Sequence, residues 1–126
     1  HKATSLHSNK NLDSRLYSLD AFKEGQFQIL VATDVARRGL DVPNVQHVIN
    51  YEMPQKITDY THRIGRTGRA GQKGLATSLL TNEDSHIMHD LKQMLSKSNN
   101  TVPPELRDHA AAQFKPDGGA KLKEIV

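Results

Sequence analysis

The chain has 126 residues, 36% of them hydrophobic, and its 17 Lys and Arg against 14 Asp and Glu give a formal net charge of +3. This length fits one domain, the lack of cysteine excludes disulfides and thiolate metal sites, and the mild positive charge favours a polyanionic partner. No apolar run approaches the roughly 20 residues that span a bilayer and no signal peptide is visible, so we expect a soluble, intracellular protein.

The first third of the chain predicts a strand, a helix and a second strand. Ala3–Leu6 is a candidate short strand. An apolar stripe then recurs at three and four residues, which predicts one face of a helix: Leu12, Leu16, Leu19 and Phe22. Gly25 is a suitable stop for that helix. Ile29–Ala32 is a continuous apolar run, which is typical of a strand buried on both faces of a parallel sheet.

The middle of the chain continues the alternation. Val48–Tyr51 and Leu75–Leu80 are further strand candidates. Between them lies a helical face formed by Ile57, Tyr60, Thr61 and Ile64. Asn82 provides a cap-like start for another helix, which ends before Ser98. The buried stripe of that helix is predicted to be Ile87, Met88, Leu91, Met94 and Leu95.

Alternating strands and helices predict an α/β domain with a parallel sheet flanked by helices. Ligands of such sheets bind at the carboxyl ends of the strands. The composition changes at Thr101, where Pro103 and Pro104 precede a short helical candidate. We therefore predict a domain over residues 1–100 and a C-terminal extension over residues 101–126.

The most informative stretch is His62–Arg69, in which three arginines fall at every third residue beside Gly65, Thr67 and Gly68. A guanidinium stays charged at physiological pH, and its planar fork fits phosphate oxygens bidentately. Glycine removes the side-chain bulk that keeps a ligand away from the backbone. This pattern indicates phosphate recognition, whereas a basic surface turn is the alternative.

Two motifs together resemble a known family. Ile29–Asp41 resembles motif V of the DEAD-box RNA helicases, and His62–Arg69 resembles their motif VI. Leu6–Arg15 is similar to the motif that precedes these two, although Ser8 and Leu12 replace the usual glycine and glutamine. The resemblance covers about residues 4–97. It implies the second RecA-like lobe of a two-lobe motor, with ATP between the lobes and RNA across both.

The same resemblance implies that parts of the motor lie outside this sequence. The phosphate loop and the Asp-Glu-Ala-Asp stretch belong to the first lobe, and the usual opening strand and helix of the second lobe are missing before His1. We expect a fragment that hydrolyses no ATP by itself. The resemblance implies Mg²⁺ with its ligands mainly on the first lobe. Scattered histidines without a metal-binding spacing predict no metal site here.

The resemblance implies a nucleotide-binding set. Arg66 and Arg69 are the candidate arginine fingers, which neutralise charge on the departing γ-phosphate. Asp41 is implied to contact the ribose, and a turn-forming aspartate before Val42 is its alternative. His62 and Arg63 are implied to couple the lobes. A structural alternative stays open for Arg63, which would support the loop through an acidic neighbour such as Asp34.

The resemblance also implies RNA-backbone contacts from Thr33, Arg38 and Gly39, whose hydroxyl, guanidinium and backbone N–H donate to phosphates without reading bases. Arg15 is placed like a further RNA contact, and surface charge on its helix is the alternative. Arg37 adds a phosphate contact or is simply solvated.

Within the family, the tail resembles that of the DEAD-box helicase of early spliceosome activation, through Pro103–Leu106, His109, Ala112-Gln113 and Lys115-Pro116. That narrower resemblance implies spliceosomal partners and a nuclear location, and without it a cytoplasmic location is expected. Two alternatives to an RNA helicase lobe stay open. One is a non-enzymatic basic RNA-binding or scaffold module, and the other is a DNA helicase of the same superfamily. The intact arginine motif favours the enzyme, because RNA binding alone needs no arginine fingers.

Overall fold

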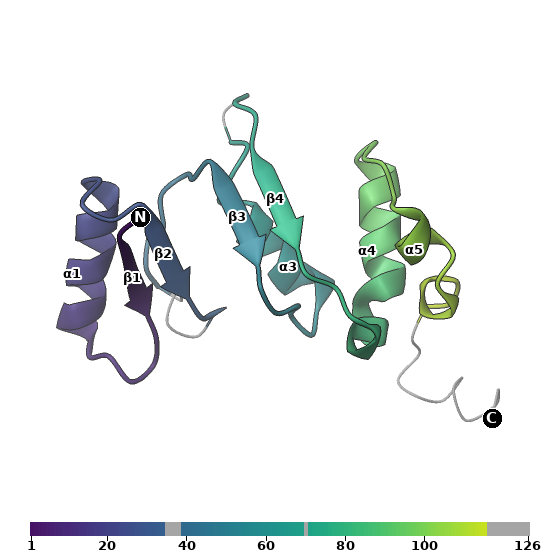
Figure 1. The fold of residues 1–126 in the computed structure, drawn as a ribbon, viewed down its shortest axis with the longest axis horizontal. Coiled ribbons are helices and arrows are strands. Elements are labelled where there is room, and N and C mark those ends of the chain that lie inside the picture. The colour runs from purple at the N-terminus through teal and green to yellow at the C-terminus, as the bar shows by residue number, and fades with distance from the viewer. Residues whose placement is uncertain (35–38, 70, 116–126) are drawn as a thin grey trace. The chain divides into compact units, whose positions relative to one another are not determined.

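The computed structural model describes residues 1–34, 39–69 and 71–115. The chain divides into two compact units, His1–Asn44 and Val45–Val126. Each unit contains a pair of parallel strands among its described residues (Figure 1). The predicted α/β class and the parallel strand direction are therefore confirmed.

The first unit contains β1 (Ala3–Leu6), α1 (Leu12–Lys23) and β2 (Ile29–Ala32). β1 and β2 pair in parallel, with Ala3 opposite Ile29 and Leu6 opposite Ala32. The side chain of Asn11 caps α1 by accepting from Ser14 N at 2.8 Å. Gly25 follows the helix at φ +82°, which glycine adopts without steric cost. The predicted strand, helix and strand are all present.

The buried face of α1 differs from the predicted leucine stripe. Leu19 is buried together with Ser18 and Ala21, whereas Leu12 is 59% and Leu16 is 39% exposed. A polar contact explains the difference, because Thr4 Oγ1 donates to Ser18 Oγ at 3.0 Å and turns that side of the helix toward β1. The hydroxyl of Ser18 is thereby satisfied inside the unit.

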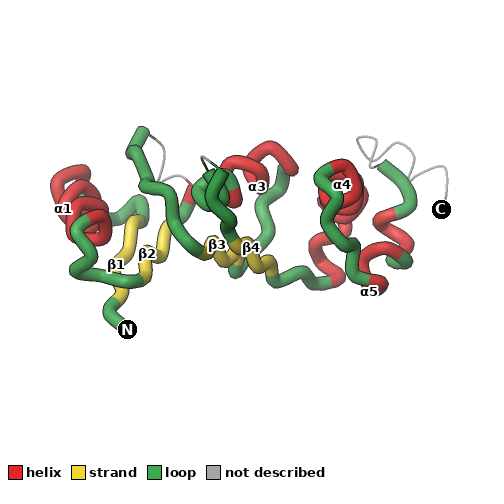
Figure 2. Tube along the Cα trace, turned by 90° about the horizontal axis from the view of Figure 1, so that it is seen from above, coloured by secondary structure: helices red, strands yellow, loops and turns green. Residues whose placement is uncertain are grey.

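The second unit begins with β3 (His47–Asn50), α3 (Ile57–Ile64) and β4 (Leu75–Ser78). β3 and β4 pair in parallel, and α3 lies on one side of the pair (Figure 2). The remaining elements are η1 (Asn82–Asp84), α4 (Ser85–Lys97), α5 (Pro104–Arg107) and η2 (Ala110–Ala112). Thr81 and Asp84 form a reciprocal capping box at the start of this helical region.

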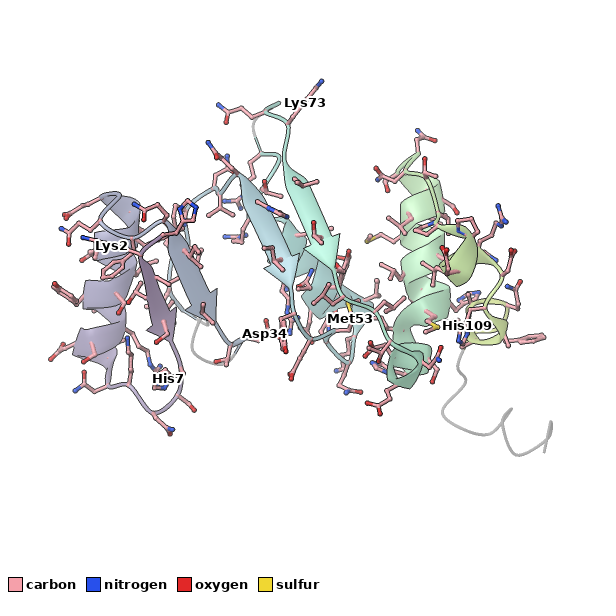
Figure 3. All side chains as sticks on the ribbon, in the orientation of Figure 1. Lys2, His7, Asp34, Met53, Lys73 and His109 are labelled. Atoms are coloured by element: carbon pink, nitrogen blue, oxygen red, sulfur yellow. The ribbon has the colours of Figure 1, made fainter. Side chains whose placement is uncertain are left out.

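The core of the second unit forms around α4, whose Ile87, Met88 and Leu91 are buried. Partners from elsewhere in this unit are Met53, Tyr60, Leu106 and Ala112. Figure 3 labels Met53, which is 8% exposed. The segment after residue 100 thus contributes Leu106 and Ala112 to this core. The domain boundary at residue 100 stays a prediction.

The strands are not buried on both faces as the apolar runs predicted. Ile29 and Val31 of β2 are 44% and 59% exposed, and Ile49 of β3 and Leu75 of β4 are 62% and 57% exposed. The physical reason is the small size of each layer: among the described residues each sheet has two strands, with α1 or α3 against one face. None of the described helices has the length and apolar character needed to cross a membrane.

Candidate functional site

The candidate site centres on the arginine loop, which we define as Gly65–Arg69. The loop begins where α3 ends, with Gly65 N donating to Thr61 O at 2.9 Å and Thr67 N donating to Ile64 O at 3.1 Å. Gly68 adopts φ +68°, a left-handed conformation that residues with a side chain resist. The glycine that the motif predicted is therefore required by the turn itself.

The backbone of the arginine loop is attached to the start of β3. Val45 N donates to Arg66 O at 2.6 Å, and Thr67 Oγ1 donates to Gln46 O at 3.1 Å. Gln46 O also accepts from Leu75 N at 3.2 Å, at the start of β4. One carbonyl thus connects the loop to both strands of this sheet, so the path of the loop is fixed by the sheet.

Gly74 directly precedes β4, and its contact with the arginine loop was not predicted from the sequence. An ideal Cβ built on Gly74 would lie 2.8 Å from Gly68 Cα and would also overlap Gly68 N and Thr67 Oγ1. The backbone at Gly74 therefore passes against the arginine loop at a distance that only glycine permits. The sequence alone did not distinguish Gly74 from Gly71, which also follows the motif but has no atom within 4 Å of its Cβ position.

Arg63 is held at the opposite end of β3. Its Nη1 donates to Asn50 Oδ1 at 3.3 Å and to the backbone oxygen of Glu52 at 2.6 Å. The two partners are an amide oxygen and a backbone carbonyl, which sequence reasoning did not name. Support through an acidic neighbour such as Asp34 stays a prediction. The role of Arg63 in coupling the lobes stays a prediction.

The other site residues of the second unit differ in exposure. His62, on the last turn of α3, and Arg69, at the end of the loop, are exposed, whereas Arg66 is half-buried. His62 and Arg63 thus lie on the last turn of α3, and Arg66 and Arg69 lie in the loop that follows it. Exposure makes Arg69 accessible to an anion, and its catalytic role stays a prediction.

The first unit contains the residues predicted to contact RNA and ribose. Thr33 directly follows β2, and its N–H donates to Leu6 O at 3.2 Å. Gly39 adopts φ +75° with no atom within 4 Å of a Cβ position, and Asp41 is exposed. These residues follow the carboxyl end of a parallel strand, as the fold class predicts. Arg37 and Arg38 lie outside the described residues.

Arg15 has a structural role within the first unit. Its Nε donates to Lys10 O at 3.0 Å and its Nη2 donates to Ser8 O at 3.2 Å. The guanidinium therefore holds the connection between β1 and α1 in place. The RNA contact of Arg15 stays a prediction. Across residues 1–34, 39–69 and 71–115, no group of three or more His, Cys, Asp or Glu side chains is arranged to hold a metal ion.

The chain belongs to the helicase conserved C-terminal domain family, which matches residues 1–71. It is 62% identical over 115 residues to DEAD-box ATP-dependent RNA helicase 21 of Oryza sativa subsp. japonica, covering 91% of this chain and 16% of that protein. The crystal structure of the yeast DEAD-box splicing factor Prp28 shares 36% identity and a TM-score of 0.79, over 92% of this chain and 26% of that one.

Prp28 from Chaetomium thermophilum, solved with bound ADP, shares 54% identity and a TM-score of 0.74, over 86% of this chain and 27% of that one. The chain thus spans between about a sixth and about a quarter of the length of these relatives. The predicted RecA-like fold and the predicted resemblance to the C-terminal lobe of DEAD-box helicases, including the splicing branch, are confirmed.

Proposed function

We propose that this chain is the second lobe of an ATP-dependent RNA helicase that acts in pre-mRNA splicing in the nucleus. The observation that carries the proposal is the arginine loop. Its backbone is fixed to β3 through Val45 and Gln46, and Arg69 at its end is exposed to a ligand. A rigid backbone with an accessible guanidinium suits the stabilisation of charge that develops only in the transition state.

The chemistry of the residues present suits a nucleoside triphosphate. Arg66 and Arg69 would bind the phosphates, because a guanidinium pairs bidentately with phosphate oxygens. Asp41 would accept hydrogen bonds from the ribose hydroxyls. When bound, ATP with Mg²⁺ would supply the phosphoryl group that is transferred to water, and the metal ligands would lie mainly on the first lobe. The ADP bound to Chaetomium Prp28 supports the assignment to this fold.

The RNA-binding side of the proposal rests on Thr33, Arg38 and Gly39. A hydroxyl, a guanidinium and an exposed backbone N–H donate to phosphate oxygens and do not discriminate bases. Nucleotide and RNA would each favour closure of the two lobes, so each would raise the affinity for the other. The isolated 126-residue chain is expected to hydrolyse no ATP, because it holds one side of the proposed site.

The first test is Arg69→Ala in the full-length protein that carries this sequence. The change removes a charge aimed at the γ-phosphate, so RNA-stimulated kcat is expected to fall by about 10³-fold or more while ATP binding persists. The matched control is Lys73→Ala, which removes a positive charge four residues away. Figure 3 shows Lys73 at the tip of the connection into β4, with its side chain directed outward. Unchanged turnover in Arg69→Ala would remove the arginine-finger assignment.

The second test is Arg38→Ala, measured by fluorescence anisotropy with two RNA strands of unrelated sequence. Loss of one phosphate contact is expected to lower the affinity for both strands by about the same factor. It should also reduce the slope of log K against log salt by about 0.7, the contribution of one phosphate contact to a single strand. Weakened binding of one strand alone would show base recognition and would contradict the backbone assignment.

A further inference from the structure

A buried polar cluster joins α3 to the carboxyl ends of β3 and β4. We call it the amide cluster, and its members are Asn50, Tyr60, Arg63 and Ser78. Asn50 is 2% exposed and Tyr60 is 5% exposed. Asn50 Nδ2 donates to Ser78 Oγ at 3.1 Å, and Ser78 Oγ shares a hydrogen bond of 3.0 Å with Tyr60 Oη. Asn50 Oδ1 accepts from Arg63 Nη1 at 3.3 Å.

The orientation of the Asn50 amide follows from its partners. A guanidinium has only donors, so the atom of Asn50 that faces Arg63 must be the carbonyl oxygen. The amide nitrogen then faces Ser78, whose oxygen can accept. Both polar ends of a nearly inaccessible side chain are thus satisfied, which fixes the rotamer of Asn50 and the position of the guanidinium together.

Two contacts of the cluster lie on one face of α3. Tyr60 and Arg63 are three residues apart, so they project from the same side of the helix. An apolar interface tolerates rotation of a helix about its axis better than directional hydrogen bonds do, because it fixes no donor–acceptor geometry. The amide cluster therefore specifies the rotation of α3 on the sheet, and the arginine loop begins directly after this helix.

We propose that Asn50 is a positioning residue for the arginine loop. It holds Arg63 at the carboxyl end of β3, while Gln46 at the start of β3 holds Thr67. One strand thereby anchors the helix and the loop from its two ends, and Arg66 lies between the anchors. The role rests on the proposed function, because the direction of Arg66 matters only if it meets a phosphate.

The test compares Asn50→Leu with Asn50→Asp in the full-length protein. Leucine has a similar size and accepts nothing, whereas aspartate retains the oxygen that faces Arg63. The matched control is Thr77→Val, which breaks the 2.9 Å contact between His47 Nε2 and Thr77 Oγ1 on the opposite face of the same strands. The readouts are kcat and KM for ATP in the presence of RNA, and amide hydrogen exchange over residues 62–69.

Asn50→Leu is expected to lower kcat by about 10- to 100-fold, because a small misplacement of a catalytic group has that effect. KM for ATP is expected to change less than about threefold, since the lost interaction belongs to the transition state. Exchange over residues 62–69 is expected to accelerate. Asn50→Asp is expected to restore kcat to within about threefold of the wild type, and Thr77→Val to leave both readouts unchanged.

Two results would overturn the proposal. One is that Asn50→Leu matches Thr77→Val in kcat and exchange, and the other is that Asn50→Asp is as impaired as Asn50→Leu. If the leucine variant does not fold, the smaller Asn50→Ser replaces it in the comparison with Asn50→Asp. If the wild-type protein has no RNA-stimulated ATPase activity, the proposed function is rejected. The positioning role of Asn50 is then judged by hydrogen exchange alone. Faster exchange over residues 62–69 in Asn50→Leu supports that role, and unchanged exchange excludes it.

Discussion

At the scale of single residues, the arginine loop depends on its glycines as much as on its arginines. Gly68 provides a left-handed turn, and Gly74 lets a second stretch of backbone pass against it. The motif made the first requirement visible in the sequence. The second arises from a contact between two segments, so no local pattern around Gly74 could reveal it.

Gly74→Ala is expected to lower the free energy of unfolding by about 1–3 kcal/mol, the usual effect of forcing an extra methyl group into a filled space. Here the methyl group would meet the backbone of Gly68, which cannot rotate away as a side chain can. Thermal unfolding of the full-length variant provides the measurement, with the exposed Gln72→Ala as the control. Equal melting temperatures for the two variants would show that the loop is not packed as described.

At the scale of elements, apolar runs predicted β2, β3 and β4, and helical periodicity predicted α1, α3 and α4, because these patterns report local backbone geometry. Periodicity also predicted the buried face of α4, where Ile87, Met88 and Leu91 are buried, but not that of α1. In α1 the Thr4–Ser18 hydrogen bond selected the buried side, and Leu12 was left exposed. Hydrogen bonds between distant segments, such as Asn50 to Ser78, leave no periodic signal in the sequence.

The segment after residue 100 offers a prediction at this scale. Leu106 of α5 is 5% exposed in the core around α4, whereas Phe114 is 67% exposed. Leu106→Ala is expected to destabilise the protein by about 2–5 kcal/mol, since a buried leucine loses its contacts and leaves a cavity. Phe114→Ala is expected to change stability by less than about 0.5 kcal/mol.

Urea unfolding followed by intrinsic fluorescence or circular dichroism measures both variants. The larger aromatic deletion should have the smaller effect, which reverses the order expected from side-chain size alone. If Leu106→Ala were as mild as Phe114→Ala, residues 101–115 would be an independent extension, as the predicted boundary at residue 100 implies.

At the scale of the whole molecule, the candidate residues fall into two groups that belong to different units. Thr33, Gly39 and Asp41 follow β2 in the first unit, and Arg66 and Arg69 follow α3 in the second. Each group therefore follows a strand or helix of its own unit. Motif spacing identified these residues as candidates, and their roles stay predictions. The contacts of Asn50 and Gly74 that support the second group required the structure.

The central claim is that Arg66 and Arg69 complete a phosphate site whose other side is a separate lobe. The most direct measurement is a crystal structure of the full-length protein with RNA, ADP and beryllium fluoride in place of the γ-phosphate. We expect guanidinium nitrogens of both arginines within about 3.2 Å of the phosphate mimic or its neighbouring oxygens. Both guanidinium groups directed into bulk solvent, with the nucleotide bound and the lobes closed, would contradict the claim.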